Sequence, residues 1–356
     1  MSRSRGILLA ALGVLAIAAL GAVAWLRLQP AEPRLVFGAV LEPLGPLVLL
    51  SMNADGTDVQ PAYPGARDRA HGWTGSSADA ETLVFFSYNA DDLQAPRQLE
   101  VLDAPGASPR VLHEIPAGTG LLDMVLSPDG RTVLLSVAEQ NGSGTAHLMA
   151  IDVADGSSRE LDVGSEGVPR DLAWSPDGST VAYVANGLWT MAPDGSSRQP
   201  VTLPADVVDP RTPSWSPDGT ALAFMGRPNS GERHQLFTIS TTGDAAIWSS
   251  LEGVEDDLAF LPRWSPDGRS IAFESSVLGS QMQTFLATTA GEVRPIDDRP
   301  AGSWDPRWTR DGTAITYSAR VGDDRYQLVR VPPEGGQAVP LGPEFPGPIS
   351  ATEWLR

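Results

Sequence analysis

Short runs of apolar and β-branched residues recur along the chain from residue 35 to its end, and Gly, Pro, Asp and Ser separate them. Typical runs are Val133 to Val137, Val181 to Val184 and Ile271 to Glu274. Runs of this length, bounded by turn residues, predict β-strands rather than helices. We therefore expect an all-β fold for this part of the chain.

One phrase precedes several of these runs. It reads Trp-Ser-Pro-Asp-Gly at 174–178, 215–219 and 264–268, Leu-Ser-Pro-Asp-Gly at 126–130 and, in a weaker copy, Trp-Thr-Arg-Asp-Gly at 308–312. Pro presets φ at the second turn position, Asp hydrogen-bonds nearby backbone, and Gly adopts the positive φ that closes the turn. Each phrase therefore predicts a tight turn between the first and second strands of a hairpin.

A third and a fourth run follow in each unit after another Gly turn, such as Ala154-Asp155-Gly156. Successive units begin 41 to 53 residues apart. Four short strands in a repeat of this length are typical of a β-propeller blade.

The number of blades follows from counting first strands. They stand at Trp73, Leu126, Trp174, Trp215, Trp264, Trp308 and Trp354. Leu35 to Val40, Val48 to Met52 and Val59 to Pro61 resemble the second to fourth strands of a blade that lacks its first strand, and Ser350 to Leu355 would supply it. We expect a seven-bladed β-propeller closed by the C-terminal strand. A six-bladed ring is the alternative, because the unit at Trp73 is degenerate.

The repeated phrase followed by an Ile-Ala-Phe-like strand, as at Trp264 to Phe273, resembles the repeat of TolB-type β-propellers, which are related to WD-repeats. The resemblance covers nearly all of the chain after residue 34 and implies the propeller fold. TolB itself has a separate α/β domain before its propeller and works in periplasmic envelope complexes. No such domain fits between Arg27 and Arg34, so we expect the resemblance to concern the propeller alone.

The N-terminus carries an uncharged apolar segment, Ile7 to Leu26. As a helix it would be about 30 Å long, enough to span a bilayer core. Arg3 and Arg5 precede it, so the positive-inside rule would place the propeller outside the cytoplasm. We expect a membrane anchor at 1–28, a linker at 29–33 and the propeller at 34–356. The alternative is a signal peptide cleaved after Ala24, which leads to the same extracytoplasmic side.

Composition excludes many function classes. The chain has 44 acidic and 25 basic residues and a net charge of -19, which disfavours nucleic acid as a partner. Every basic residue is Arg and Cys is absent, so Schiff-base lysines, thiol nucleophiles, disulfides and Cys-bearing zinc sites are excluded. No Gly-x-Ser-x-Gly or His-Glu-x-x-His motif occurs. We expect no catalytic nucleophile and no cofactor, with a divalent cation in the channel as the open alternative.

Two groups of residues are candidates for binding. Connections between strands 2 and 3, and between successive blades, are long and share one face of a propeller, which we call the long-loop face; the connections on the opposite face are short. Residues near the channel mouth are His71, Asp123, Asp171, Arg263, Asp305, Arg307 and Glu353. Acidic doublets on the long-loop face include Asp256, Asp257, Asp323 and Asp324. We interpret the Asp of the repeated phrase as a turn residue and its Trp as packing between blades.

Two functions remain open. The leading hypothesis is a non-enzymatic, membrane-tethered envelope propeller that binds a protein or peptide, preferably basic, through the long-loop face. The alternative is a propeller hydrolase, lyase or lactonase with a divalent cation in the central channel. Three carboxylates within about 5 Å of one another, with no Arg between them, would favour the enzyme.

Overall fold

The computed structural model describes residues 34–355 except 93–94, 140–144, 165–166, 168, 229–233, 242–259, 276–281, 289–290 and 298–301. The expected anchor at 1–28 and linker at 29–33 lie outside the described residues. A search of the described part of the chain finds no helix that is both long and apolar enough to cross a membrane.

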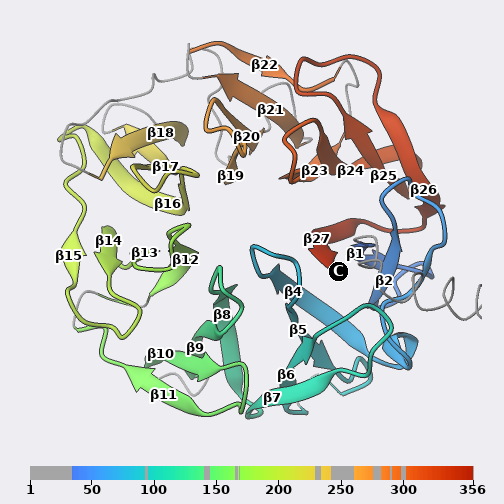
Figure 1. The fold of residues 1–356 in the computed structure, drawn as a ribbon, viewed down its shortest axis with the longest axis horizontal. Coiled ribbons are helices and arrows are strands. Elements are labelled where there is room, and N and C mark those ends of the chain that lie inside the picture. The colour runs from blue at the N-terminus through green and yellow to red at the C-terminus, as the bar shows by residue number, and fades with distance from the viewer. Residues whose placement is uncertain are drawn as a thin grey trace, which may run out of the picture.

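Seven antiparallel sheets form a ring around a central axis (Figure 1). In each of blades 1 to 3, the strand named first lies nearest the central axis and the others follow outwards. Blade 1 contains β27 (Ile349–Leu355), β1 (Arg34–Val40), β2 (Leu47–Asn53) and β3 (Gln60–Pro61). The 3-10 turn η1 (Ala66–Asp68) leads to blade 2, with β4 (Ala70–Ser76), β5 (Leu83–Tyr88), β6 (Arg97–Leu102) and β7 (Arg110–Ile115). Blade 3 contains β8 (Thr119–Leu126), β9 (Thr132–Glu139), β10 (Ala146–Asp152) and β11 (Ser158–Leu161).

The remaining blades repeat this order. Blade 4 contains β12 (Arg170–Trp174), β13 (Val181–Val184), β14 (Leu188–Met191) and β15 (Gln199–Pro200). Blade 5 has three strands among the described residues, β16 (Val207–Trp215), β17 (Ala221–Pro228) and β18 (Gln235–Ser240). Blade 6 contains β19 (Phe260–Trp264), β20 (Ser270–Ser275), β21 (Gln283–Thr288) and β22 (Val293–Pro295). Blade 7 contains β23 (Ser303–Trp308), β24 (Ile315–Gly322), β25 (Arg325–Val331) and β26 (Val339–Phe345).

The C-terminal strand closes the ring, as the sequence predicts. Residues of β27 pair with β1 in antiparallel register, with Leu355 opposite Arg34 and Glu353 opposite Val36. The seven-blade count is confirmed and the six-blade alternative is wrong.

The assignment of Trp73 as the head of the second unit is corrected by the structure. The turn of blade 2 is Ser77-Ala78-Asp79-Ala80, where Ser77 Oγ lies 2.6 Å from Asp79 Oδ1, as Ser127 Oγ does from Asp129 Oδ1 in blade 3. Ala80 has φ 59° where the other turns have Gly. Trp73 therefore stands three residues before the position that Trp occupies in the other blades. The pattern was hidden because Ser76, Ala78 and Ala80 replace the Trp, Pro and Gly of the phrase.

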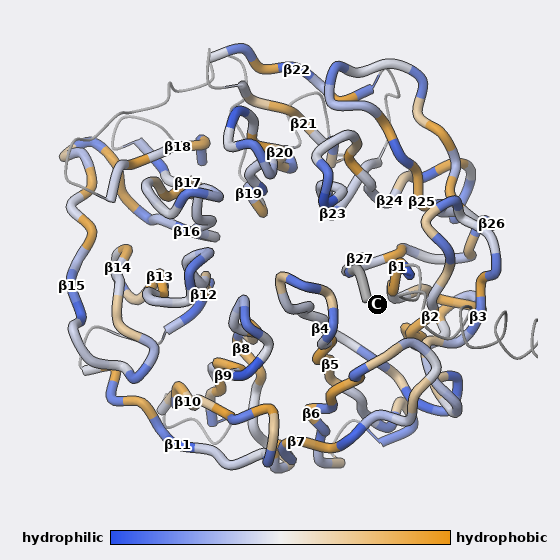
Figure 2. Tube along the Cα trace, viewed as in Figure 1, coloured by the Kyte–Doolittle hydropathy of each residue, from blue (hydrophilic) through white to orange (hydrophobic). Residues whose placement is uncertain are grey.

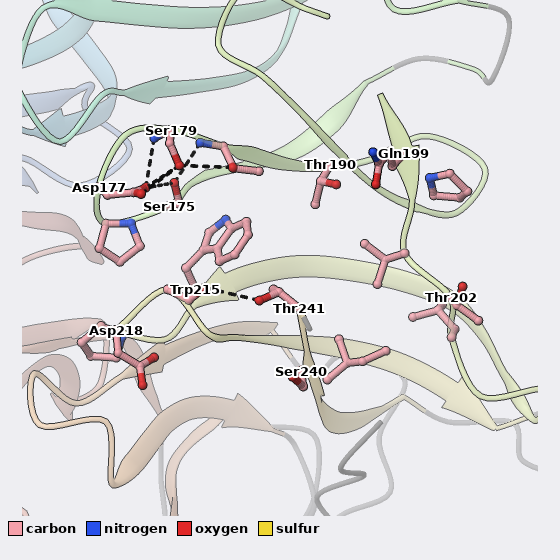
Figure 3. Close-up of a pocket in the computed structure, with 18 of the residues that line it drawn as sticks. Ser175, Asp177, Ser179, Thr190, Gln199, Thr202, Trp215, Asp218, Ser240 and Thr241 are labelled. Carbon is pink, nitrogen blue, oxygen red and sulfur yellow. Dashed lines mark hydrogen bonds between the residues drawn. The ribbon is translucent and has the colours of Figure 1, made fainter. Parts of the chain in front are cut away.

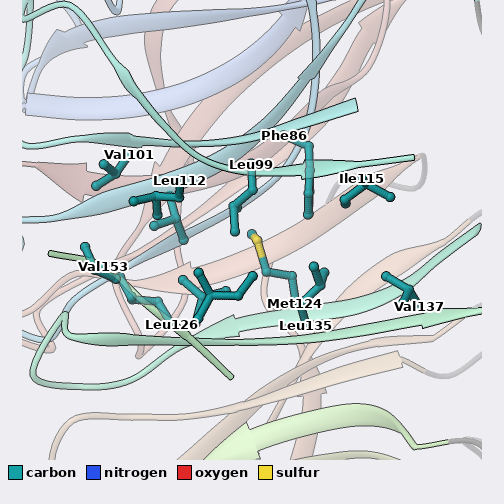
Figure 4. Packing of buried hydrophobic residues seen from close by; sticks show 13 residues of the cluster. Phe86, Leu99, Val101, Leu112, Ile115, Met124, Leu126, Leu135, Val137 and Val153 are labelled. Atoms are coloured by element: carbon teal, nitrogen blue, oxygen red, sulfur yellow. The ribbon is translucent and has the colours of Figure 1, made fainter. Parts of the chain in front are cut away.

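Each interface between neighbouring blades has its own hydrophobic core. In the cluster between blades 2 and 3, Phe86 and Leu99 face Met124 and Leu135 (Figure 4). Leu134, which directly precedes Leu135 in β9, belongs to the cluster between blades 3 and 4. Side chains alternate along a strand, so strands buried on both faces need apolar residues at consecutive positions. The hydropathy trace shows these apolar stretches within the blades and polar residues at many of the turns (Figure 2).

Candidate functional site

A cavity of about 540 Å³ lies in the central channel and is lined by first-strand residues of all seven blades. It brings together five residues that the sequence singled out near the channel mouth, from five different blades. These residues are Asp123, Asp171, Arg263, Arg307 and Glu353. Pro128 and Pro176 of the repeated turns also line it, so the cavity reaches the short-turn face.

The charged residues occupy two positions of the first strands. Asp123, Asp171 and Asp305 stand three residues before the Trp or Leu of the phrase, whereas Arg263 and Arg307 stand directly before the Trp. The first strands are irregular here, with register shifts in β8, β12, β19 and β23. At the first of the two positions Asp171 and Asp305 have φ 51° and 53°. Asp tolerates this left-handed conformation better than most residues.

The carboxylates at the channel connect neighbouring blades. Asp123 accepts hydrogen bonds from the backbone N–H of Met124, at 2.7 Å, and from that of Leu172 in the next blade. Asp171 accepts one from Thr212 N–H at 3.2 Å, again in the next blade. In the same way, Glu274 of β20 accepts a hydrogen bond from Asp305 N–H. These carboxylates act as inter-blade acceptors.

Glu274 is not among the residues predicted from the sequence. It lies in the interior of a strand, where nothing in the repeat distinguishes it from a solvent-facing position, yet it is only 6% exposed. Its charge within a β-rich apolar run is the only sequence signal that could have found it.

The two channel arginines differ in their partners. Arg307 Nε lies 3.1 Å from Asp305 Oδ1, and Arg307 Nη1 lies 3.5 Å from Glu353 Oε1. Glu353 Oε2 also accepts a hydrogen bond from Ser76 Oγ at 2.7 Å. The guanidinium of Arg263 forms no hydrogen bond or ion pair with the described residues, and its Nε is buried.

Burial and charge shift the pKa values of these groups. Burial raises the pKa of Asp123 to about 6 and that of Glu274 to about 7. The neighbouring Arg307 charge, followed by burial, lowers the pKa of Arg263 to about 10. Burial opposes the charge of Arg307 itself, but Asp305 and Glu353 hold its pKa above the ordinary value. Within the described residues, Arg307 forms direct ion pairs, whereas Arg263 forms none and is only attracted from a longer distance by Asp305, Glu353 and Glu274.

The described residues do not fit a divalent cation in the channel. No group of three His, Asp or Glu side chains that could hold a metal ion occurs among them. A hard cation requires several oxygen ligands at once. Here the oxygens of Asp305 and Glu353 face Arg307, and those of Asp123 accept backbone amides.

The other predicted site residues lie apart from the channel cavity. His71 is buried at the interface of blades 1 and 2, with Nε2 2.5 Å from Tyr63 Oη and Nδ1 3.3 Å from Leu47 O. Burial lowers the pKa of His71 to about 4, so the ring is neutral. Asp323 and Asp324 are exposed at the tip of the β24–β25 hairpin. Asp256 and Asp257 lie outside the described residues.

The repeated Trp residues connect blades, as expected. The indole Nε1 of Trp215 donates to Ala173 O at 3.0 Å, and that of Trp308 donates to Arg263 O at 2.9 Å. Each bond joins one first strand to that of the preceding blade.

A second cavity, of about 870 Å³, lies between blades 4 and 5 on the short-turn face (Figure 3). Trp215 forms part of its wall, with Asp177 and Thr241 on either side (Figure 3). No pattern in the sequence predicts this cavity, because residues of two different blades line it.

Comparisons with known proteins support the fold. No protein-family profile and no curated protein matches the chain. An oligogalacturonate lyase in complex with manganese is similar, with 16% identity, a TM-score of 0.64 and coverage of 85% of this chain and 86% of that one. TolB from Acinetobacter baumannii has 16% identity and a TM-score of 0.56, over 90% of this chain and 82% of its own. A periplasmic gluconolactonase from Pseudomonas aeruginosa has 17% identity and a TM-score of 0.55, over 91% and 99%.

At these identities the likeness concerns the fold and not the activity. This likeness in fold agrees with three features of the chain: the repeated phrase at the hairpin turns, the four-stranded blades and the closure of the ring. The chain has the fold of the TolB-type β-propellers.

Proposed function

We propose that the protein is a non-enzymatic binding propeller of the bacterial envelope, which captures a basic protein or peptide on its long-loop face. The observation that carries the proposal is a row of three hairpin tips from the adjacent blades 7, 1 and 2. Each tip joins the second and third strands of its blade, so all three point to the same face.

The row combines exposed apolar and acidic side chains. Leu44 at the β1–β2 tip is fully exposed, at 105% of its reference area. Val321 in the β24–β25 hairpin is 38% exposed. Acidic doublets stand on both sides of Leu44, with Asp91 and Asp92 in blade 2 and Asp323 and Asp324 in blade 7.

Such a surface suits a partner that carries basic groups around an apolar residue. Binding residues are often presented by loops on a rigid scaffold, and complementary charge increases the rate and selectivity of association. The acidic surplus of the whole chain reinforces this preference.

The enzymatic alternative, a hydrolase, lyase or lactonase with a channel cation, has less support. The solved neighbours include both TolB and enzymes, so the fold does not select between the two functions. Arg307 occupies the space between Asp305 and Glu353, where a cation would need free carboxylate oxygens.

The extracytoplasmic location is part of the proposal. The apolar segment Ile7 to Leu26 supports it, with 1–28 retained as an anchor or cleaved after Ala24. Sedimentation with membranes after a salt wash, followed by N-terminal sequencing, separates the anchor from the cleaved form.

The test is capture of partners from solubilised bacterial membranes, with the full chain as bait. Exchanging Asp91, Asp92, Asp323 and Asp324 for Asn should release the partner, as should raising the salt concentration, because salt screens charge attraction. Asp256→Asn and Asp257→Asn form a second set that tests how far the surface extends. The control exchanges are Asp103→Asn and Glu334→Gln, which alter exposed acids on the short-turn face and should leave capture intact.

Two results would contradict the proposal. One is a set of captured partners that the four Asn exchanges leave unchanged. The other is turnover of a sugar, ester or lactone by the purified protein, at a rate that a chelator abolishes.

A further inference from the structure

Two charged side chains that face the channel cavity form no direct ion pair with any described residue, although Asp305, Glu353 and Glu274 attract the charge of Arg263 from a longer distance. Arg263 in blade 6 makes no side-chain hydrogen bond or ion pair with any of them, and its Nε is buried. Asp171 in blade 4 accepts one backbone hydrogen bond, from Thr212, and forms no ion pair within the described part of the chain. Both are lining residues of the 540 Å³ cavity.

The neighbouring charged groups are already engaged. Arg307 pairs with Asp305 and Glu353, Asp123 accepts two backbone amides, and Glu274 accepts the amide of Asp305. A buried charge without a counter-charge is costly. Among the described lining residues, Arg263, whose Nε is buried without a hydrogen bond, and the partly buried Asp171 can therefore each form a direct ion pair with a ligand.

The two unpaired groups lie on opposite sides of blade 5. The acidic side comprises Asp123 and Asp171 from blades 3 and 4, and the arginine side comprises Arg263 and Arg307 from blades 6 and 7. Between them, Thr212, Pro213 and Ser214 of β16 line the cavity. In the ring, β12 and β19 stand on either side of β16 (Figure 1). The cavity thus has two carboxylates on one wall and two guanidinium groups on the other, where Glu353 pairs with Arg307.

We propose that this cavity binds a small zwitterion, an α-amino acid or a dipeptide, whose carboxylate pairs with Arg263 and whose ammonium group pairs with Asp171. The planar guanidinium can donate two parallel hydrogen bonds to a carboxylate. The cavity volume lies in the range of small-molecule sites, about 300 to 1,000 Å³. Pro176, Leu172 and Leu261 provide apolar wall for a ligand side chain.

Ligands with one charge suit the site less well. A simple anion that pairs with Arg263 would leave Asp171 without a direct counter-charge, whereas a simple cation that pairs with Asp171 would leave Arg263 without one. Only a ligand with both charges satisfies both walls. This site is separate from the hairpin tips of the long-loop face and does not depend on partner capture there.

The test is calorimetric titration of the full chain with the twenty L-amino acids and their homodipeptides, after a thermal-shift screen of the same panel. At least one zwitterion should bind. Its N-acetyl form, which lacks the ammonium group, and its amide, which lacks the carboxylate, should each bind about tenfold or more weakly, because each loses one charged hydrogen-bonded pair.

Variants identify the residues. Arg263→Gln should weaken binding of the best zwitterion about 10- to 100-fold and abolish discrimination against its amide form. Asp171→Asn should weaken binding similarly and abolish discrimination against the N-acetyl form. Arg269→Gln, an exchange at an exposed turn of the same blade, should leave affinity unchanged. Melting of each ligand-free variant shows that it is folded, and Arg263→Lys replaces Arg263→Gln if the latter is not.

The outcomes are distinct. Failure of the whole panel to bind overturns the proposal, as does equal affinity for the N-acetyl form, which would indicate an anion site. Unchanged affinity in both Arg263→Gln and Asp171→Asn also overturns it. Loss of zwitterion binding with intact partner capture separates this site from the long-loop face.

Discussion

The Asp of each repeated turn accepts hydrogen bonds from a Ser or Thr hydroxyl and from a backbone amide, and these bonds fix the turn. In blade 5, Ser216 Oγ donates to Asp218 Oδ1 at 2.6 Å and Thr220 N–H donates to the same oxygen at 3.0 Å. The same hydroxyl and amide bonds lower the pKa of Asp177 in blade 4 to about 2. The turn thus accounts for these carboxylates without a ligand.

The Gly of the turn is needed for its backbone conformation. Gly219 has φ 70°, and a Cβ placed there would meet only Pro176 Cδ, at 3.9 Å. Gly219→Ala should therefore lower the free energy of unfolding by about 1 kcal/mol through backbone strain alone. Thermal and urea melting measure the loss. Gly72→Ala is the control, because Gly72 has no positive φ and open space around its Cβ position, and stability should stay equal or rise slightly. Equal losses in the two variants would contradict the argument.

Glu274 should make stability depend on pH. Its folded pKa of about 7 lies above the ordinary 4.5, so the folded state binds its proton more tightly than the unfolded state. Stability from this group is present below pH 4.5 and is lost as the pH rises through 7. Glu274→Gln keeps an oxygen for Asp305 N–H and removes the charge. The variant should match the parent near pH 4.5 and exceed its free energy of unfolding by on the order of 2 kcal/mol at pH 8.

The quantity to follow is the free energy of unfolding of Glu274→Gln minus that of the parent at each pH. His71 is neutral when buried, with a lowered pKa, so its contribution to stability is lost as the pH falls below 6.5. The His71 effect on stability runs in the opposite direction to that of Glu274 over the same pH range. It is the same in variant and parent, so it cancels when their free energies of unfolding are subtracted. Urea melts at several pH values measure this difference in the free energy of unfolding. A difference that does not grow with pH would contradict the role given to Glu274.

At the scale of elements, β27 joins the two ends of the chain. Its backbone pairs with β1, Ile349 is 2% exposed, and Glu353 contacts both Ser76 of blade 2 and Arg307 of blade 7. The strand thus connects three blades, and without it β1 would become an exposed sheet edge at the channel.

Deleting residues 350–356 should lower the free energy of unfolding by roughly 3 kcal/mol or more, since several backbone hydrogen bonds are lost at about 0.5 to 1.5 kcal/mol each. Thermal melting of the shortened chain measures the effect. Glu353→Gln, which keeps the strand, its backbone hydrogen bonds and an oxygen that can accept from Ser76, should cost less than the deletion because Arg307 retains Asp305 as its ion-pair partner. A shortened chain that melts like the parent would show that β27 does not hold the ring closed.

At the scale of the whole molecule, the repeated turns contact one another around the short-turn face. Pro128 lies against Gly178, Pro176 against Gly219 and Pro217 against Gly268. Blade 1 has no such turn, because β27 and β1 belong to opposite ends of the chain. Arg310 Nη1 of blade 7 donates a hydrogen bond to Asp79 O of blade 2 at 3.1 Å and so spans the place where blade 1 lacks a turn.

Much of the ring could be predicted from the sequence, because its signals are local. A turn needs only the Ser, Asp and Gly of one phrase, and each strand shows its own apolar run. The blade count and the closure by β27 followed from these signals. The sequence assigns Trp73 to the wrong position of the repeat, because the turn of blade 2 lacks the Trp, Pro and Gly that mark the other turns.

The sequence by itself determined the strands, the turns and the set of charged residues near the channel. The tertiary structure alone decided how those charges pair, because each pair joins different blades: Arg307 with Glu353, Asp171 with Thr212 N–H, and Glu274 with Asp305 N–H. Arg263 and Arg307 hold the same place in their repeats, yet within the described residues only Arg307 has a carboxylate at ion-pair distance. The physical reason is that the ring places first strands from distant parts of the chain around one channel, and their spacing in sequence does not record which side chains meet there.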